Sequence, residues 1–220
     1  MHIGLIGGIG PAATDFYYRR LIQHAAKTGR SLDLTMVHAD APKLLANLVA
    51  DDHKAQIAIY DRLTQRLVAA GADCVVVTSI AGHFCIDGFM ETSPLPVIDI
   101  TKVLSNWLGS SGMERVGILG TETVMASGVF GKLAPVEVLA PQGDALSAVH
   151  TSYVTLAQSG IPTDALANDF VSAGQALLER GAEAILLGGT DLNAVFTEEV
   201  RPFPIVDCAS IHIDEIAKRI

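Results

Sequence analysis

The sequence predicts an α/β fold with two pseudo-symmetric parallel-sheet lobes and a ligand cleft between them. Two observations lead to this fold class. Short apolar runs rich in β-branched residues alternate with longer segments of helical periodicity, as is typical of parallel strands connected by helices. In addition, several of these segments occur twice along the chain in the same order, which indicates two similar halves.

The predicted strands are short and are bounded by glycine or proline, as expected for strands buried on both faces of a sheet. They cover residues 2–7, 32–38, 74–78, 97–100, 116–120, 136–139, 185–188 and 205–208. Between them, apolar residues recur at helical spacing, and the predicted helices cover residues 11–28, 51–70, 100–110, 144–158, 163–180 and 211–219.

The internal repetition consists of three pairs of segments. HIGLIGG at 2–8 matches RVGILGT at 115–121, GADCVVVTS at 71–79 matches GAEAILLGG at 181–189, and LPVIDI at 95–100 matches FPIVDC at 203–208. Each second copy follows the first by 108 to 113 residues. We therefore expect two lobes, the first made of residues 1–100 together with 205–220 and the second of residues 101–204.

Composition limits the class of function. Half of the residues are hydrophobic, 18% are charged, and the formal net charge is −9 at pH 7. Nucleic-acid binding is not expected, because it needs clustered lysine and arginine. A membrane span is not expected either, because no apolar run approaches the roughly 18 to 20 residues required.

The cysteines and the N-terminus indicate the cellular compartment in which the protein is expected. The three cysteines, Cys74, Cys85 and Cys208, show no spacing typical of a disulfide framework, and no His/Cys/Asp cluster has the spacing of a metal site. The N-terminus lacks the basic region that begins a signal peptide. We expect a cytoplasmic protein without a bound metal.

The ends of four predicted strands define the expected ligand site, because ligands of open parallel sheets bind beyond the carboxyl ends of the strands. These ends are Gly7–Gly8, Thr78–Ser79, Gly120–Thr121 and Gly188–Thr190. If the lobes face each other, the four ends close on one cleft. Their small side chains leave backbone N–H groups free to bind an anion such as a carboxylate.

The stretch GLIGGIGPAAT also contains a loose dinucleotide fingerprint, Gly8-x-Gly10-x-x-Ala13, after a strand and before a helix. Asp40 would then be the acid that binds a ribose. Against this alternative, Pro11 removes an N–H group that a pyrophosphate would need. A nucleotide-binding oxidoreductase would also leave the repetition in the second half unexplained.

Four segments resemble the aspartate/glutamate racemase superfamily: GGIGPAAT at 7–14, VGILGTETVMASGVF at 116–130, and the two turns that end GADCVVVTS and GAEAILLGG. The order and spacing match over essentially the whole chain. The resemblance implies two α/β lobes with the active site between them, chemistry without a cofactor, a small-molecule carboxylate ligand and a homodimer.

Both catalytic cysteines of the family are replaced in this sequence. Aligning the family turn Cys-Asn-Thr-small-His with SIAGH at 79–83 places Ser79 at the first cysteine, and Ile80 at the asparagine. Aligning Gly-Cys-Thr-Glu with GGTD at 188–191 places Gly189 at the second cysteine and Asp191 at the glutamate. The carboxylate-binding arginine of the family corresponds to Leu44, and a family lysine to Gln158, so a less polar ligand than aspartate is expected.

The resemblance leaves three candidate catalytic residues. His83 is the first candidate, because an imidazole pKa near ~6.5 needs little tuning for acid/base work. Ser79 could form a hydroxyl–imidazole pair with it, and Asp191 could assist from the other lobe or cap a helix. Cys85 is expected to pack in the core. The expected ligand contacts are Gly8, Ile9, Gly10, Ile80, Ala81, Thr121, Thr123, Gly189 and Thr190.

The sequence thus favours a cofactor-independent isomerase, tautomerase or lyase that acts at the carbon next to a carboxylate. A decarboxylase-like reaction belongs to this class, because it needs only one acid. The alternative is a protein that kept the cleft and binds a carboxylate ligand without turnover.

Overall fold

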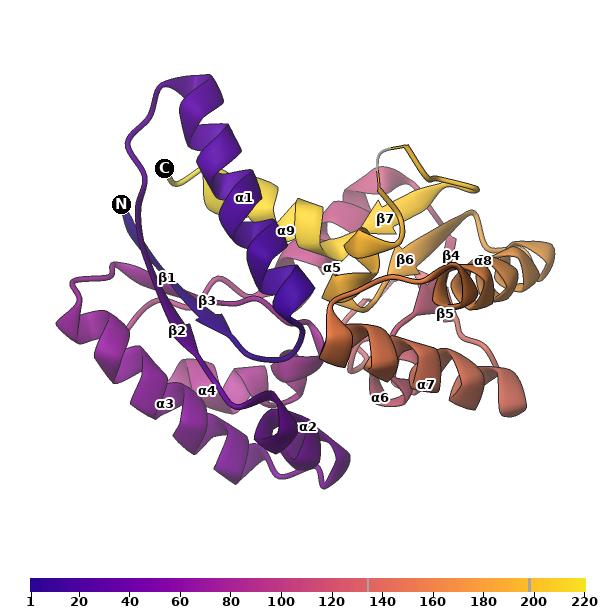
Figure 1. The fold of residues 1–220 in the computed structure, drawn as a ribbon, viewed down its shortest axis with the longest axis horizontal. Helices are drawn as coiled ribbons and strands as arrows, with labels where there is room; N and C mark the ends of the chain where they lie inside the picture. The colour runs from indigo at the N-terminus through magenta and orange to yellow at the C-terminus, as the bar shows by residue number, and fades with distance from the viewer. Residues whose placement is uncertain (134, 198) are drawn as a thin grey trace.

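The computed structural model describes residues 1–133, 135–197 and 199–220. They form two sheets, with strand orders β2-β1-β3 and β5-β4-β6-β7, and every strand pair is parallel (Figure 1). The predicted fold class is confirmed. The strands are β1 (His2–Gly7), β2 (Asp33–His38), β3 (Cys74–Val77), β4 (Arg115–Leu119), β5 (Glu137–Leu139), β6 (Ala184–Leu187) and β7 (Ile205–Asp207).

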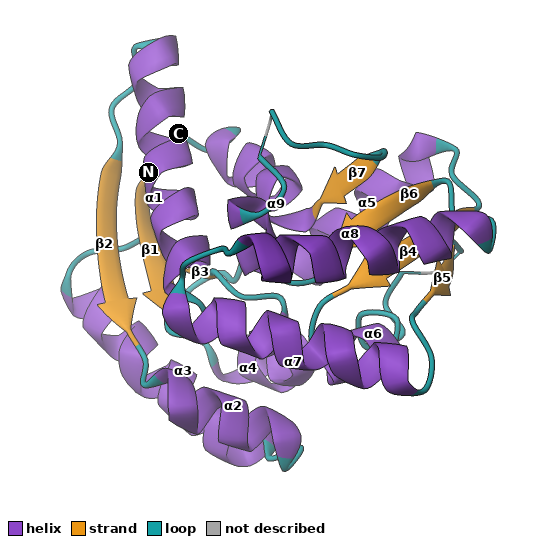
Figure 2. Ribbon diagram, turned by 45° about the vertical axis from the view of Figure 1, so that its right-hand side comes forward, coloured by secondary structure: helices purple, strands orange, loops and turns teal. Residues whose placement is uncertain are grey.

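Helices cover both sheets, and Figure 2 shows α7 and α8 in front of the second sheet. The α-helices are α1 (Pro11–Thr28), α2 (Ala41–Val49), α3 (His53–Ala69), α4 (Ile86–Thr92), α5 (Ile100–Ser111), α6 (Glu122–Ala126), α7 (Asp144–Ser159), α8 (Asp164–Glu179) and α9 (Cys208–Ala217). Two short 3₁₀ helices follow the central strands, η1 (Ala81–Cys85) after β3 and η2 (Thr190–Ala194) after β6.

Most predicted elements form within a few residues of their expected bounds, but the strand expected at 97–100 does not. Only Val97 forms a bridge there, to Val75 of β3. The reason is local: the side chain of Asp99 accepts a hydrogen bond from the backbone N–H of Thr101 at 2.8 Å and caps α5. Helices α2, α4 and α6 were not predicted, because each is short.

The two faces of the first sheet follow the two-residue period of a strand. Ile3 and Leu5 of β1 pack on one face with Tyr17 of α1 and Ile213 of α9. Ile6, on the other face, packs with side chains of α2, α3 and α4. All these side chains are almost fully buried, so the sheet is covered on both sides.

Helix α5 packs in the core around the second sheet, and helix α9 packs in the core around the first. Leu104 and Leu108 of α5, which follows the first sheet in the chain, belong to the core around the second sheet. Ile213 and Ile216 of α9, which follows the second sheet, belong to the core around the first. The two helices also contact each other, and α9 lies beside α1 (Figure 1). The lobes therefore share their hydrophobic cores.

The expected lobe boundary is wrong for one strand, β7. Residues 205–220 were expected to pack on the first lobe, but β7 pairs with β6 in the second sheet. The helix that follows it does pack on the first lobe. The physical reason is the N-cap: Asp207 accepts from the backbone N–H of Ala209 at 3.0 Å and starts α9 at the edge of the second sheet, so the chain crosses over only after the strand has paired.

Among the residues that the structure describes, no helix combines the length and the apolar character required to span a bilayer.

The shared cores predict that α5 stabilises the whole chain. Replacing the fully buried Leu104 by alanine should lower the free energy of unfolding by about 2 to 5 kcal/mol, because the lost contacts and the cavity both cost stability. Val49→Ala is the control, because Val49 is 80% exposed, and it should change this free energy by less than about 0.5 kcal/mol. Equal unfolding curves for the two variants in urea would contradict the packing of α5 in a shared core.

Candidate active site

The candidate site is built from two matching turns at the carboxyl ends of β3 and β6. Each strand ends in a short loop and continues into a 3₁₀ helix, η1 or η2. In the repeat that links Gly71 to Gly181, position 79 corresponds to 189 and position 83 to 193. Equivalent backbone positions therefore carry different side chains: Ser79 and His83 on the first turn, and Gly189 and Asn193 on the second.

Four buried polar atoms on these two turns have no hydrogen-bond partner among the residues that the structure describes. They are Ser79 Oγ, His83 Nε2, Thr190 Oγ1 and Asn193 Nδ2. Buried polar groups are normally paired, because an unpaired one costs free energy. Each of the two equivalent turns therefore leaves buried polar groups that a ligand or solvent can satisfy.

His83 is held in one tautomer with one nitrogen free. Its Nδ1 lies 2.7 Å from the carbonyl oxygen of Ser79. A carbonyl oxygen only accepts, so Nδ1 carries the proton and Nε2 presents a lone pair. Burial lowers the pKa of His83 below its ordinary value of 6.5, although the charge of Asp99 and the bond to Ser79 oppose this change. The ring is therefore neutral at neutral pH.

A second buried histidine lies behind the first. The ring centroids of His212 and His83 are 6.4 Å apart in an edge-to-face arrangement. His212 donates from Nε2 to the carbonyl oxygen of Ile98 at 2.9 Å, and its Nδ1 accepts from the hydroxyl of Tyr17 at 2.8 Å. Burial lowers the pKa of His212 to about 3, so this ring carries no positive charge at neutral pH.

Asp191 joins the second turn to the first lobe. Its Oδ1 accepts from the backbone N–H of Ala13, in the first turn of α1, at 3.0 Å. Its Oδ2 accepts from the hydroxyl of Tyr153, on α7, at 3.1 Å. Burial raises the pKa of Asp191 to about 6, and both hydrogen bonds oppose that rise. The carboxylate lies against Gly10, where any side chain would overlap it.

The hydrogen bond from the N–H of Ala13 to Asp191 argues against the dinucleotide-binding alternative. A pyrophosphate bound by the fingerprint would need the N–H groups at the start of α1. One of them, that of Ala13, already donates to Asp191. Asp40, the proposed ribose acid, lies 3.6 Å from Lys43 in an exposed ion pair. Neither position has the arrangement that a bound dinucleotide requires.

The other expected ligand contacts have different surroundings. Seven of them are buried: Gly8, Ile9, Gly10, Ile80, Ala81, Gly189 and Thr121. Thr121 caps α6 by accepting from the backbone N–H of Val124 at 3.3 Å, whereas Thr123 is exposed to solvent. Leu44 is buried against Gly8, and the neighbouring Lys43 side chain is 74% exposed.

The three cysteines are buried and pack in the cores. Burial raises the pKa of Cys85 to about 12, and its Sγ lies 3.9 Å from the carbonyl oxygen of Gly82. Cys85 belongs to the apolar cluster of the first lobe. A thiolate is therefore strongly disfavoured at this position.

Two residues of the site were missed in the sequence. Asn193 could have been found from the repeat, because it is the counterpart of His83. Tyr153 carried no sequence signal, because it lies on α7, far from both turns in the chain, and only tertiary packing brings it to Asp191.

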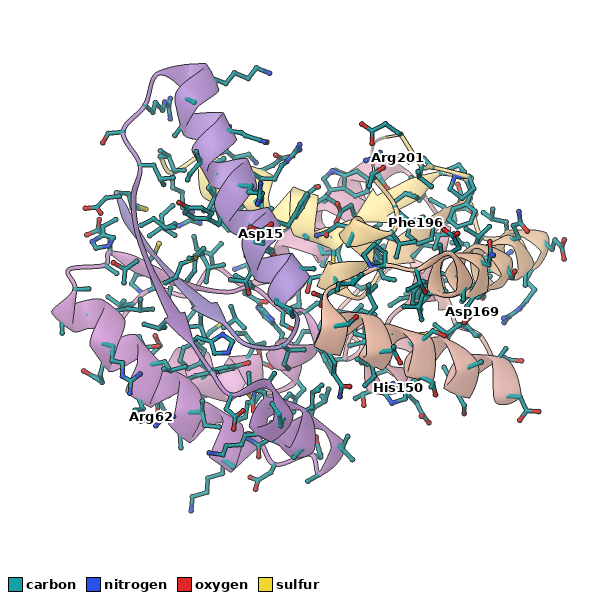
Figure 3. The ribbon with its side chains drawn as sticks, in the orientation of Figure 1. Asp15, Arg62, His150, Asp169, Phe196 and Arg201 are labelled. Carbon is teal, nitrogen blue, oxygen red and sulfur yellow. The ribbon has the colours of Figure 1, made fainter. Side chains whose placement is uncertain are left out.

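A surface groove of about 590 Å³ runs past the second turn. Asn193 lines it, together with residues of α1 and of the loop that follows η2. Figure 3 labels Asp15 on α1 and both Phe196 and Arg201 on the loop side of this groove. The second turn is thus the part of the site that lies nearest to this groove.

Two parallel α/β sheets, each followed at the end of a central strand by an equivalent turn, are the architecture of the racemase-like class. The sequence model of the Asp/Glu/Hydantoin racemase family matches residues 6–216. The chain belongs to this family, as the resemblance of its motifs predicted.

Individual relatives are similar over their whole length but distant in sequence. The broad specificity amino-acid racemase RacX of Bacillus subtilis is 21% identical, with 94% of this chain and 93% of that protein covered. Among solved structures, an Asp/Glu racemase candidate from Yersinia pestis has a TM-score of 0.83 at 24% identity, covering 100% of this chain and 99% of the other. An aspartate racemase homologue from Pyrococcus horikoshii has a TM-score of 0.78 at 21% identity, with 99% of each chain covered.

The buried carboxyl of Asp191 predicts a measurable pH dependence of stability. Its pKa is about 6 in the folded chain, against an ordinary value of 3.8. Because the folded-state pKa is raised, the associated stability is fully present below about pH 4 and is lost as the pH rises through 6. The free energy of unfolding of the wild type, relative to Asp191→Asn, should fall by up to about 3 kcal/mol over this range.

Urea denaturation of both proteins at several pH values checks this prediction. Asparagine keeps an oxygen that can accept from Ala13 N–H, so the variant is a close structural match. A difference between the two proteins that stays constant with pH would contradict the raised pKa of Asp191.

Proposed function

We propose that this protein transfers a proton at the carbon next to a carboxylate, without a cofactor, as an isomerase, tautomerase or lyase. The observation that carries the proposal is the set of four unpaired buried polar atoms on the two turns. Its membership of the Asp/Glu/Hydantoin racemase family supports the same class of reaction. The name of the Bacillus subtilis relative adds amino acids to the ligands worth testing.

In this proposal His83 carries the proton. Its Nε2 lone pair is free and buried, and its Nδ1–H is fixed by the carbonyl of Ser79. A neutral imidazole in this state can accept a proton from carbon and return it. The Ser79 hydroxyl, also unpaired, would bind the ligand or assist the transfer. Asp191 uses both oxygens for Ala13 and Tyr153, which supports a positioning role for it.

The carboxylate of the ligand would be bound by neutral donors. Thr190 Oγ1 and Asn193 Nδ2 are unpaired and can donate to an anion. The positions around Gly8 are apolar, because Leu44, Ile9 and Ile80 are all buried there or on the neighbouring turn. A monocarboxylate with an apolar substituent fits this environment better than a dicarboxylate does.

The proposal is tested by deuterium incorporation from D₂O into a panel of carboxylates, followed by NMR. The panel should include L-alanine, L-aspartate, L-glutamate and 2-phenylpropionate. For any acid that exchanges, His83→Gln should slow exchange by about 10²- to 10⁴-fold, the usual contribution of a general acid or base. His24→Gln, a change at a histidine of α1 outside both turns, is the matched control and should exchange like the wild type.

Exchange at the same rate in His83→Gln would remove His83 from this role. If ligands stabilise the protein against heat while none of them exchanges, the alternative of a carboxylate-binding protein without turnover is supported instead.

The pH dependence of exchange provides a further prediction. Because burial lowers the pKa of His83 below 6.5, the neutral base persists to lower pH than an exposed histidine would allow. As the pH is lowered, the rate at low ligand concentration, which reports the free protein, should fall with its midpoint below pH 6.5. A rate that already falls between about pH 8 and 7 would contradict a buried neutral base.

The ligand environment predicts a preference among acids. By isothermal titration calorimetry, 2-phenylpropionate should bind more tightly than L-aspartate, because a second carboxylate would lose its hydration without a cation to pair with. Leu44→Arg should reverse the order by adding that cation. Tight binding of L-aspartate to the wild type would refute the proposed ligand class.

A further inference from the structure

The peptide unit between Gly82 and His83 is hydrogen-bonded at both ends. Its N–H group donates to the carbonyl oxygen of Ile80 at 3.0 Å. Its carbonyl oxygen, that of Gly82, accepts from the hydroxyl of Tyr60 on α3 at 3.2 Å. Because a peptide unit is planar, hydrogen bonds to its two ends fix its orientation, and with it the position of the His83 Cα atom.

A chain of side chains sets the direction of the hydrogen bond from Tyr60. The carbonyl of Gly82 only accepts, so the hydroxyl of Tyr60 donates to it. The hydroxyl oxygen in turn accepts from Gln56 Nε2 at 2.9 Å. Gln56 Oε1 accepts from Asn47 Nδ2, on α2, at 3.0 Å. Gln56 and Tyr60 are almost fully buried, where such hydrogen bonds are electrostatically stronger than in water. Every donor in this chain points from α2 toward the first turn.

The space at Gly82 is matched to the Tyr60 hydroxyl. A Cβ built on Gly82 would overlap the hydroxyl oxygen, whereas Cγ1 of Val77, the nearest atom of any other residue, would lie at an ordinary contact distance of 3.4 Å. The Tyr60 ring cannot easily move away, because it is buried and packs against the ring of Phe89 on α4, with 5.2 Å between the ring centroids. Tyr60 reaches this carbonyl because position 82 has no side chain.

The fixed backbone gives the His83 ring one orientation. Its Nδ1 donates to the carbonyl oxygen of Ser79 at 2.7 Å, which sets the rotation of the ring relative to the turn. The peptide unit held by Tyr60 sets the position from which the ring projects. Together these hydrogen bonds determine the direction in which the unpaired Nε2 presents its lone pair. Proton transfer from carbon depends on this direction, because a displacement of about 1 Å can cost about 10²-fold in rate.

We propose that Tyr60 is a positioning residue for His83: its hydroxyl holds the peptide unit between Gly82 and His83 and so fixes the direction of the Nε2 lone pair. The consequence for catalysis rests on the proposed function. Tyr60 does not itself transfer a proton, because burial raises the pKa of its phenol far above the ordinary value of 10. The hydroxyl keeps its proton and remains a donor to Gly82.

The positioning is tested without a ligand by ¹⁵N NMR of the imidazole rings, with the His83 resonances assigned from their loss in His83→Gln. Tyr60→Phe removes the hydroxyl and keeps the ring. It should move both His83 nitrogen resonances, because the turn and the imidazole can then reorient. Thr64→Val is the matched control, because it removes another buried hydroxyl of α3, which donates to the backbone carbonyl of Tyr60 at 2.8 Å. It should leave the His83 resonances unchanged.

Unchanged His83 resonances in Tyr60→Phe would overturn the inference. Equal changes in Tyr60→Phe and Thr64→Val would overturn it as well, because they would indicate a general loss of packing in α3.

The fit between Tyr60 and Gly82 is tested by combining two substitutions. Gly82→Ala should lower the midpoint of thermal unfolding by about 2 to 12 °C, as overpacking does in a chain of this length. In a Tyr60→Phe background, which lacks the overlapping oxygen, the same substitution should lower the midpoint much less. Equal shifts in the two backgrounds would contradict the placement of the hydroxyl.

If Tyr60→Phe does not fold, the two glycine variants still decide the matter. A Cβ at Gly109 meets nothing within 4 Å, so Gly109→Ala should leave the His83 resonances in place, whereas Gly82→Ala should move them. A Gly82→Ala variant that is as stable as Gly109→Ala, with unmoved His83 resonances, would overturn the inference.

The consequence for proton transfer is tested with any acid that exchanges deuterium. Tyr60→Phe should lower the kcat of exchange by about 10- to 10²-fold and leave KM within about twofold, because Tyr60 contacts the turn rather than the ligand. Thr64→Val should exchange like the wild type. A Tyr60→Phe variant that exchanges at the wild-type rate would overturn the role of Tyr60 and leave the proposed function intact. If no acid exchanges with the wild type, the proposed function fails, and the NMR resonances alone decide whether Tyr60 holds His83.

Discussion

The carboxylate of Asp191 is the contact on which the arrangement of the site depends. It accepts one hydrogen bond from the start of α1 in the first lobe and one from Tyr153 on α7 in the second. Gly10 leaves the space that the carboxylate occupies. Because the group is buried, its hydrogen bonds must be satisfied by protein donors. These bonds fix the second turn relative to both the first lobe and the Tyr153 ring.

Two further aspartates help to fix the position of the two lobes relative to each other. Asp99 and Asp207 occupy equivalent positions in the repeated segments, and each caps the helix that follows it, α5 or α9. The packing of α5 and α9 then ties the relative position of the lobes to the hydrophobic cores. The relative position of the two sheets therefore depends on core packing, which is stiffer than a surface contact.

The two turns carry different side chains on this common fold. Their backbones are equivalent, but His83 corresponds to Asn193 and Ser79 to Gly189. A symmetrical scaffold therefore carries an unsymmetrical set of side chains. The family fold accounts for the position of the two turns at the strand ends, whereas the proposed chemistry depends on the few positions at which the two copies differ.

Much of the fold was predictable because its signals are local. The alternation of strands and helices, the glycine-bounded strand ends and the repeated segments are all present in the chain itself, and they located both turns of the site. The prediction of a strand at 97–100 was wrong because Asp99 caps a helix there. The start of this helix overrides the strand preference of the β-branched residues. The partner of β7 was missed because sheet pairing depends on which edge is free, and an apolar run is compatible with either sheet.

The fold class, the family, the two turns and the residues at their tips were predictable from the amino-acid pattern alone, since each depends on local pattern or on internal repetition. Folding was needed to establish which nitrogen of His83 is free, which atoms are left without partners and what fills the space at Gly189. These depend on residues distant in the chain, above all Tyr153 and Ala13 around Asp191. Burial sets the charge of such groups, and burial exists only once the two lobes have packed together.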